Sequence, residues 1–199
     1  MARRRLRHGL SRADGYSVVE LVITVGCVAA LMAMALPTTA SVVDASRARQ
    51  AAGDIAARFR LARQRAATEG RATAVVFDQA GDGWLARTCT DGNGNGVRRA
   101  ELGGPDACVP DQASLEDQYP GVAVAIDPLV PDPGGQVGNP DPVRFGAGDM
   151  ASFSPAGTAT AGTLYLRSAG THYAVRIAGG NGRTRILRWD PGGRTWVDQ

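Results

Sequence analysis

Residues 15–37 have the sequence GYSVVELVITVGCVAALMAMALP and follow a leader with five arginines, Arg3, Arg4, Arg5, Arg7 and Arg12. From residue 18 to residue 36 the chain is apolar over 19 positions, and Glu20 is the one charged residue among them. An α-helix rises about 1.5 Å per residue, so this stretch matches a hydrocarbon core about 30 Å thick. A carboxylate inside such a helix costs about 2.5–3.5 kcal/mol on insertion scales. We therefore expect Glu20 to have a function.

Glu20 needs a cation, and cleavage after Gly15 would supply one. The new α-ammonium of Tyr16 would then lie near Glu20 of a neighbouring chain. Two unit charges about 4 Å apart attract by about 4 kcal/mol at an effective dielectric constant of about 20. This attraction is large enough to offset the insertion cost, so we expect Glu20 to guide assembly between copies of the chain.

The type and spacing of Gly15, Tyr16, Glu20 and Pro37 resemble the N-terminal pattern of type IV pilins and type II secretion pseudopilins. The resemblance implies leader cleavage between Gly15 and Tyr16 by prepilin peptidase, N-methylation of Tyr16, and helical assembly in which the new N-terminus pairs with Glu20 of another subunit. The first mature residue of that family is usually Phe, whereas here it is Tyr.

An ordinary signal peptide is the alternative, because Ala33-Met34-Ala35 could be its cleavage site. The apolar run is longer than usual for a signal peptide, and it contains Glu20. A twin-arginine address at Arg4-Arg5 is a further alternative, although the residues after it fit poorly.

The whole chain has 199 residues and a net charge of +3. Loss of residues 1–15 removes five arginines and Asp14, which leaves 17 arginines, 18 acidic residues and a net charge of −1. The basic character therefore belongs to the leader, fits cytoplasmic retention of that end, and does not indicate a nucleic-acid partner. Residues 78–149 hold four arginines and twelve acidic residues, whereas residues 167–199 hold six arginines and two acidic residues. This segregation suggests charge complementarity between neighbouring subunits, and a solvated surface explains it equally well.

Apolar residues alternate at spacings of three and four from residue 45 to residue 66, which predicts one face of a helix. They are Ala45, Ala48, Ala52, Ile55, Phe59, Ala62 and Ala66. We expect a helix from Tyr16 to about Glu69, a bend or loosening at Pro37, and a stop at Gly70. Alternating patterns then predict antiparallel strands at residues 73–78, 84–90, 121–126, 143–145, 151–153, 163–167, 172–177, 184–189 and 195–197.

The expected fold class is α+β, with a long N-terminal transmembrane-amphipathic helix packed on an antiparallel β-sheet domain. The expected domains are a leader at residues 1–15, a transmembrane and assembly helix at 16–37, an amphipathic helix at 38–70 and a periplasmic β-rich domain at 71–199.

The β-rich half resembles the GspH/FimT group of this family. The resemblance rests on the strand Val75-Val-Phe-Asp78, Trp84, the turn Asp91-Gly-Asn-Gly-Asn-Gly96, the turn Phe153-Ser-Pro-Ala-Gly157 and the terminal stretch Gly182-Arg-Thr-Arg185.

Three cysteines are present. Cys27 lies in the apolar helix, where we expect inert packing. Cys89 and Cys108 flank an irregular segment of a periplasmic domain, and we expect a disulfide between them. Two free thiols are the alternative.

The turn at residues 91–96 copies the first half of a calcium loop, with oxygen ligands at Asp91, Asn93 and Asn95. The closing glutamate of such a loop should stand at position 102, which is Leu, and Glu101 comes one residue early. The alternative is a plain turn whose glycines take positive φ. Apart from calcium, no cofactor is expected.

Arg183 and Arg185 are two residues apart on an expected strand, so they share a face about 7 Å apart. Arg188 is nearby, as are Arg194 and possible stacking surfaces at Trp189 and Trp196. Residues 182–185 resemble a stretch tied to DNA capture in FimT-type minor pilins. The alternative is that these arginines keep an edge strand soluble.

Catalysis is not expected. His8 leaves with the leader, and His172 alternates with Tyr173 and Val175 on an expected strand, so it should face solvent. The sequence has no nucleophile-elbow motif and no CxxC motif.

These observations indicate a non-enzymatic minor pseudopilin or pilin anchored in the inner membrane by a single pass, with a periplasmic C-terminal domain. The expected partners are other pilin or pseudopilin subunits, prepilin peptidase, the inner membrane, and secreted protein cargo or DNA. Three roles remain open: a type II secretion pseudopilus subunit, a DNA-binding minor pilin of the FimT type, and a membrane-anchored periplasmic binding domain.

Overall fold

The computed structural model describes residues 17–109 and 113–199, and for residues 34–41 it describes the backbone alone. The chain divides into two compact units, Met1–Ala40 and Ser41–Gln199. The first unit contains the start of helix α1 (Val18–Glu69), and the second contains the end of that helix and all the strands.

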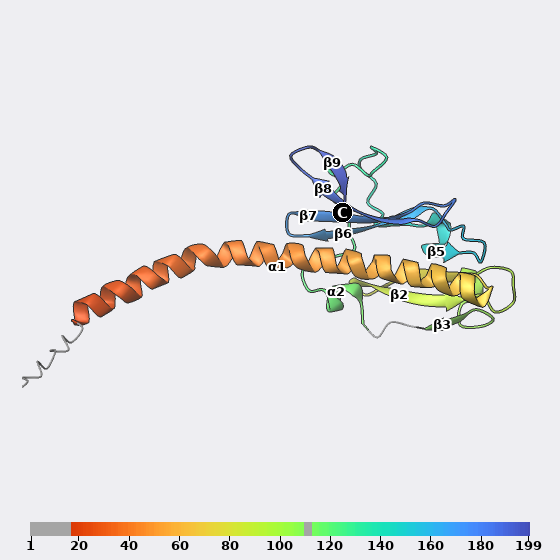
Figure 1. Ribbon diagram of the computed structural model, residues 1–199, viewed down its shortest axis with the longest axis horizontal. Coiled ribbons are helices and arrows are strands. Elements are labelled where there is room, and N and C mark those ends of the chain that lie inside the picture. Colours follow the sequence, from red (N-terminus) through yellow and green to blue (C-terminus); the bar gives the residue numbers. More distant parts are fainter. Residues whose placement is uncertain (1–16, 110–112) are drawn as a thin grey trace, which may run out of the picture. The chain divides into compact units, whose positions relative to one another are not determined.

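The part of α1 in the second unit runs alongside the strands (Figure 1), and one of its faces is fully buried. This face consists of Ala48, Ala51, Ala52, Ile55, Ala56, Phe59, Ala62 and Ala66. The predicted apolar stripe is thereby confirmed except at Ala45, which is half-buried. The helix assignment runs through Pro37 and ends at Glu69, and Gly70 follows with a φ of 65°. This left-handed conformation is open to glycine without steric cost, so the predicted stop is confirmed.

Two antiparallel sheets pack against this part of α1. The first sheet has the order β3-β2-β1-β5. Its strands are β1 (Thr73–Ala80), β2 (Gly83–Thr90), β3 (Ala107–Val109) and β5 (Met150–Phe153). The predicted hairpin of the first two strands is confirmed, with Ala80 opposite Gly83 at the turn.

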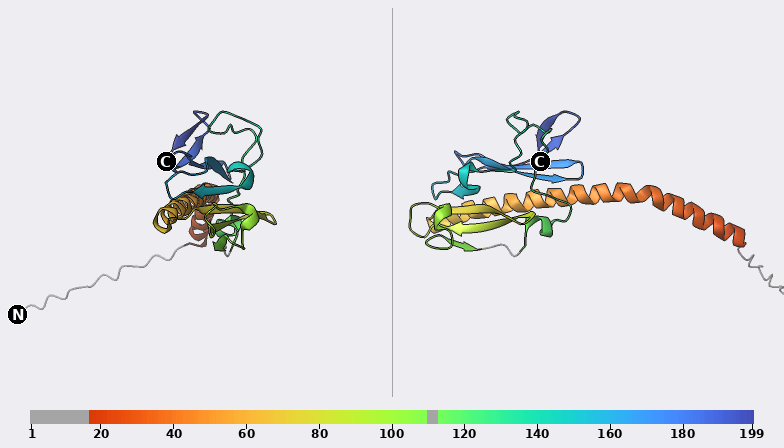
Figure 2. Two further views of the ribbon diagram at one scale, coloured as in Figure 1. Left: turned by 90° about the vertical axis from the view of Figure 1, so that its right-hand side faces the viewer. Right: turned by 180° about the vertical axis from the view of Figure 1, so that it is seen from behind.

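The second sheet has the order β4-β6-β7-β8-β9. Its strands are β4 (Val143–Arg144), β6 (Gly162–Ser168), β7 (Thr171–Ile177), β8 (Thr184–Asp190) and β9 (Thr195–Asp198). Figure 2 shows this sheet and the first sheet as separate layers of the second unit.

A cluster of phenylalanines joins the helix to both sheets. The ring of Phe59 lies 6.1 Å from that of Phe77 on β1, 6.2 Å from that of Phe153 on β5, and 5.5 Å from that of Phe145, which follows β4. All four side chains are at most 1% exposed. One helix residue therefore connects the two sheets.

The structure differs from the expected architecture in four respects. There are two sheets where one was expected, and strand β3 and the short helix α2 (Leu115–Gln118) were not predicted. The prediction of a strand at residues 121–126 is wrong, since the segment forms a single bridge between Ala123 and Arg167. The ladder does not extend because the backbone N–H of Val124 donates to the Glu116 carboxylate at 3.1 Å.

Candidate functional site

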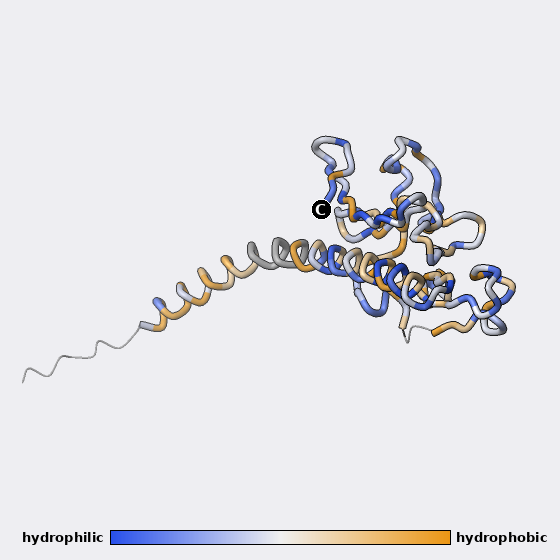
Figure 3. Tube along the Cα trace, turned by 45° about the vertical axis from the view of Figure 1, so that its right-hand side comes forward, coloured by the Kyte–Doolittle hydropathy of each residue, from blue (hydrophilic) through white to orange (hydrophobic). Residues whose placement is uncertain are grey.

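The start of α1 presents an acidic residue among uncovered apolar side chains. Glu20 lies in the first turn and is exposed. Its neighbours Val18, Val19, Leu21 and Val22 are between 57% and 77% exposed, and Figure 3 shows the apolar character of this part of the helix. Among the residues with described side chains, no helix is both long and apolar enough to cross a membrane.

The predicted cleavage site, Gly15 and Tyr16, lies outside the described residues. The first bonds of α1 come from Ser17, whose carbonyl accepts from the N–H of Leu21 at 3.1 Å and whose hydroxyl accepts from Val19. Cys27 lies on the exposed side of this helix and is a free cysteine.

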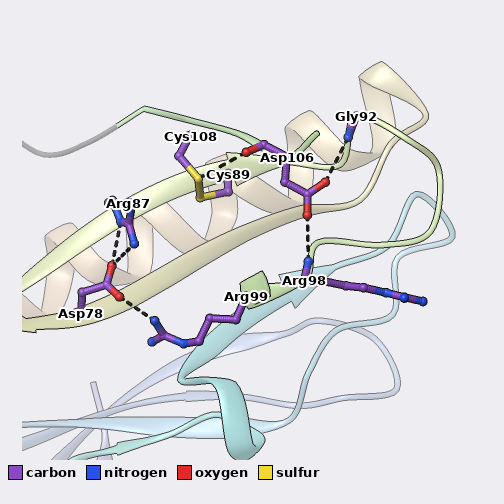
Figure 4. The surroundings of a disulfide bond; sticks show 8 residues. All are labelled: Asp78, Arg87, Cys89, Gly92, Arg98, Arg99, Asp106 and Cys108. Atoms are coloured by element: carbon purple, nitrogen blue, oxygen red, sulfur yellow. Dashed lines mark hydrogen bonds and ion pairs between the residues drawn. A yellow bond between two sulfur atoms is a disulfide. The ribbon is translucent and has the colours of Figure 1, made fainter. Parts of the chain in front are cut away.

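Cys89 and Cys108 form a disulfide (Figure 4). The two residues face one another across the β2–β3 ladder, and they are separated by 19 positions in sequence. A link across a loop of this length contributes about 3 kcal/mol to stability in the chain-entropy model. It fixes the ends of the segment that contains the glycine-rich turn.

Asp91 organises the glycine-rich turn. Its carboxylate accepts from the backbone N–H of Gly94 at 2.7 Å, of Gly96 at 2.8 Å and of Asn93 at 3.1 Å. Burial by itself raises the pKa of this carboxyl, but the backbone hydrogen bonds outweigh burial and leave the pKa below its ordinary value. Asp91 is therefore held as a buried carboxylate by amides of its own turn.

The other residues of the predicted calcium set gather at the same turn. Glu101 accepts from the side-chain amide of Asn93 at 2.7 Å and from that of Asn95 at 3.1 Å. Among the described residues, no three His, Cys, Asp or Glu side chains are close enough together to hold a metal ion. Any calcium ligand set here would thus depend on the asparagine oxygens, and Asp91 would have to bind the ion with a carboxylate that already accepts three backbone amides.

A second buried aspartate, which the sequence analysis missed, supports this turn from the side. Asp106 is fully buried and accepts from the N–H of Arg98 at 2.9 Å and of Gly92 at 3.3 Å (Figure 4). A Cβ at Gly92 would lie 1.9 Å from the carbonyl oxygen of Pro105, so only glycine fits there. The two buried aspartates therefore fix the backbone of a turn whose residues 92–95 are themselves exposed.

An ion-pair cluster lies beside the disulfide on the first sheet. Asp78 on β1 accepts from Arg87 on β2 at 2.7 Å and from Arg99 at 2.6 Å (Figure 4). Arg99 also donates to the carbonyl of Phe77 at 2.7 Å. Burial raises the pKa of Asp78, but hydrogen bonds from both arginines outweigh it and hold that pKa below its ordinary value.

The second sheet gathers arginines at its β8 edge. Arg183, in the turn before β8, and Arg185 on β8 line a common hollow of about 670 Å³. They also line a second hollow of about 340 Å³ with Arg60 of α1. Arg188 is not brought together with them, because it lies directly opposite Tyr173, on the face turned toward α1.

His172 is half-buried, so the prediction that it faces solvent is wrong. Its Nε2 is buried without a hydrogen-bond partner among the described residues. Burial lowers the pKa of its imidazole, although nearby Asp127 opposes this effect. The side chain faces a loop next to β7, which the strand pattern alone does not show.

Comparison with known proteins gives one match. A family model described as type II transport protein GspH matches residues 51–182. This range includes the buried face of α1 from Ala51 onward, the disulfide loop and the strands β1 to β7. No curated protein matches the chain, and no solved structure matches it.

Proposed function

Because the chain belongs to the GspH family of type II transport proteins, we propose that it is a minor pseudopilin of a type II secretion pseudopilus. In this role it is a non-enzymatic subunit that assembles with other pseudopilins and acts in protein secretion across the envelope. Residues 16–37 anchor it in the inner membrane before assembly, and the second unit faces the periplasm.

The observation that supports an assembly role is the position of Glu20. It is exposed in the first turn of α1 between side chains that are themselves apolar and exposed. Such a surface is unfavourable in water and has to be covered by lipid or by other subunits. A carboxylate kept within it needs a partner cation, and the α-ammonium of Tyr16 from a neighbouring subunit has the required charge.

The test compares two substitutions at Glu20 in cells that make the filament. Glu20→Gln keeps the shape and removes the charge, whereas Glu20→Asp keeps the charge. We expect Glu20→Gln to reduce incorporation into filaments about tenfold or more, because each 1.4 kcal/mol of lost attraction is a factor of ten. Glu20→Asp should retain most incorporation. The readout is the amount of the chain in sheared or cross-linked filaments, relative to its amount in the membrane. Equal incorporation of both variants and the unaltered chain would overturn the proposal.

Processing separates this role from that of a permanently anchored binding domain. We propose that prepilin peptidase cleaves after Gly15 and that Tyr16 is then N-methylated. Mass spectrometry of the N-terminus should find methylated Tyr16 in cells with the peptidase and the intact leader in cells without it. A start near residue 36 or 41 would instead identify an ordinary signal peptide.

A second candidate function, DNA binding in a FimT-like minor pilin, is favoured by one observation. Arg183, Arg185 and Arg60 line the same hollow although they come from different elements. Such a basic cluster can bind phosphates without base specificity. In an electrophoretic shift assay at low salt, Arg183→Ala/Arg185→Ala should lose binding. Arg188→Ala, which removes the same type of charge from the other face, should retain it. No shift of the unaltered chain at low salt would end this candidate.

A further inference from the structure

A second cleft, which shares Arg176, Arg185 and Leu187 with the hollow lined by Arg183, opens between the loop at residues 127–142 and the β8–β9 hairpin. In Figures 1 and 2 the loop and the hairpin rise side by side from the face of the second sheet that is turned away from α1. The indole N–H of Trp196 in the hairpin donates to the carbonyl of Pro131 in the loop at 2.7 Å, and this hydrogen bond links the two segments. The cleft has a volume of about 420 Å³, and Arg176, Arg185, Arg194, Leu187 and Trp189 are among its lining residues.

The charges in this cleft are not balanced by the protein. Arg176 on β7 and Arg185 on β8 are direct cross-strand partners, so their guanidinium groups stand on the same face. Like charges in this arrangement destabilise a sheet unless an anion lies between them. Among the described residues, the side chain of Arg176 has no hydrogen-bond or ion-pair partner. Arg185 has Asp198 at 3.7 Å, but both side chains are about half-exposed, which makes this pair weak.

The acidic wall of the cleft does not relieve this imbalance. Among the described lining residues the one carboxylate is Asp132. It is already held by Arg144 at 2.9 Å, and both side chains are largely buried. It also accepts from the N–H of Gly134 and of Gln136. The lining therefore presents three arginines against one carboxylate that is engaged elsewhere.

Arg194 adds a second sign of a binding role. It has a φ of 49°, although it is neither glycine nor asparagine, and it directly follows Gly193 in the β8–β9 turn. A residue with a Cβ pays conformational energy to adopt this left-handed backbone conformation, whereas glycine does not. Non-glycine residues in this conformation cluster at ligand sites. The turn holds a guanidinium at the mouth of the cleft in a conformation that the backbone does not favour.

The apolar part of the cleft is rigid. Leu187 packs in a cluster with Tyr165, Ala174 and Trp196. The rings of Trp189 and Trp196 lie 5.6 Å apart at an angle of 59°. Because Trp196 uses its N–H on Pro131 and its ring on its neighbours, it is fixed in place. Trp189 is half-buried and lines the cleft, where it can cover an apolar group.

We propose that this cleft binds an acidic, extended segment of a partner protein. Carboxylates of the segment lie between Arg176 and Arg185 and at Arg194, and an apolar side chain between them covers Leu187 and Trp189. A cleft of about 420 Å³ accepts a few side chains and is too small for a nucleic-acid duplex. This inference does not depend on filament assembly through Glu20 or on DNA binding at Arg183.

The test uses the full-length chain in mild detergent and a short fluorescein-labelled peptide of alternating glutamate and leucine. Fluorescence anisotropy measures binding, and a glutamine–leucine peptide controls for the apolar side chains. We expect the acidic peptide to bind. The affinity of the neutral peptide should be lower by a factor of about ten or more, because each hydrogen bond to a charged group contributes free energy of that order. Equal binding of both peptides, or no binding of the acidic one at low salt, would overturn the proposal.

Three variants locate the site. Arg176→Gln should weaken binding of the acidic peptide about tenfold, whereas Arg188→Gln, which removes the same charge from the opposite face of β8, should leave it unchanged. Arg194→Gly should weaken binding while the melting temperature stays equal or rises, because glycine accepts the left-handed conformation. If single-stranded DNA displaces the peptide and loses affinity in the same variants, the cleft is a nucleic-acid site and the peptide proposal is wrong.

Discussion

The two sheets of the second unit each bury one face against α1. Their outer faces differ in how far the charged side chains are paired. On the first sheet, Asp78 has two arginine partners, and a segment closed by a disulfide covers the face with its buried aspartates satisfied. On the second sheet, Arg176 and Arg185 oppose one another beside an open cleft. Paired charges stabilise the first face. On the second face Arg176 has no ion pair among the described residues and Arg185 has only a weak, half-exposed one, so these two charges add little to the stability of the fold and are available for binding.

The largest effect should come from the residue that both sheets share. Phe59→Ala removes the ring that contacts Phe77, Phe145 and Phe153. Loss of a buried phenylalanine costs about 3–5 kcal/mol. The free energy of unfolding in urea should fall by this amount, and hydrogen exchange should increase in both sheets. Protection that fell in one sheet alone would show that the two sheets have separate cores.

Loss of the disulfide should have the next largest effect, with its local part confined to the first sheet. Replacing both cysteines, as in Cys89→Ala/Cys108→Ala, should lower the free energy of unfolding by about 3 kcal/mol. Cys27→Ala, on the exposed side of α1, is the control and should have no such effect. Hydrogen exchange should increase most for residues 91–106, beyond the smaller increase that the lower free energy of unfolding causes in β7 and β8. An increase in the second sheet as large as that at residues 91–106 would contradict the separation of the two faces.

The paired charge of the first sheet has a pH dependence with a definite sign. The pKa of Asp78 is below its ordinary value, because the hydrogen bonds from Arg99 and Arg87 outweigh burial. Its contribution is therefore present above about pH 4 and is lost as pH falls through the lowered pKa. Asp78→Asn should destabilise the protein by about 1–2 kcal/mol at neutral pH, and the two proteins should converge at lower pH.

The control for this comparison is Asp82→Asn in the turn of the same hairpin, where the aspartate is exposed. It should leave the pH profile of thermal unfolding unchanged. If Asp78→Asn and the unaltered chain stayed parallel down to pH 2, the ion pairs would not supply the stability assigned to them.

Calcium should stabilise the segment beside the first sheet and leave the second sheet unchanged. We expect weak binding through Asp91, Asn93, Asn95 and Glu101, in the range of about 10⁻⁴–10⁻³ M typical of extracellular modules. At a calcium concentration of about ten times the dissociation constant, the gain is about 1.4 kcal/mol. Calorimetry and thermal unfolding measure it, and Glu101→Gln should remove the gain. Calorimetry without heat at millimolar calcium would contradict calcium binding.

Much of the fold follows from short-range pattern. The spacing of alanines around Ile55 and Phe59 predicts the buried face of α1, and Gly70 predicts its end, because both depend on the geometry of one helix. The hairpins follow from glycines between alternating strands. The segment at residues 121–126 has the alternating pattern of a strand but does not form one. Its Val124 N–H donates to the Glu116 carboxylate on α2 and so does not join a strand ladder.

The candidate sites depend on contacts that no local pattern contains. Arg183 and Arg185 are visible from their spacing, but Arg176 becomes part of the same face only through the register of β7 with β8. The cleft also requires a hydrogen bond between Trp196 and Pro131, which lie 65 positions apart. Closeness in sequence suggests that Arg188 belongs with the other arginines. Side chains alternate across a strand, however, so its even position places it on the opposite face from their odd positions.

The smallest expected effect is a gain in stability, whereas removal of the groups that stabilise the first sheet causes a loss. It directly tests the difference between the outer faces of the two sheets. Arg176→Gln removes one of two like charges that face one another, so it should stabilise the protein by about 0.2–1 kcal/mol at low salt. The gain should shrink in salt of about 1 M, where the screening length is about 3 Å. Arg167→Gln on β6 is the matched control, because its cross-strand partner is His172 and not a second arginine. Thermal unfolding at two salt concentrations measures both variants. If Arg176→Gln destabilised the protein instead, this arginine would hold the sheet together, and the outer faces of the two sheets would not differ in the way described.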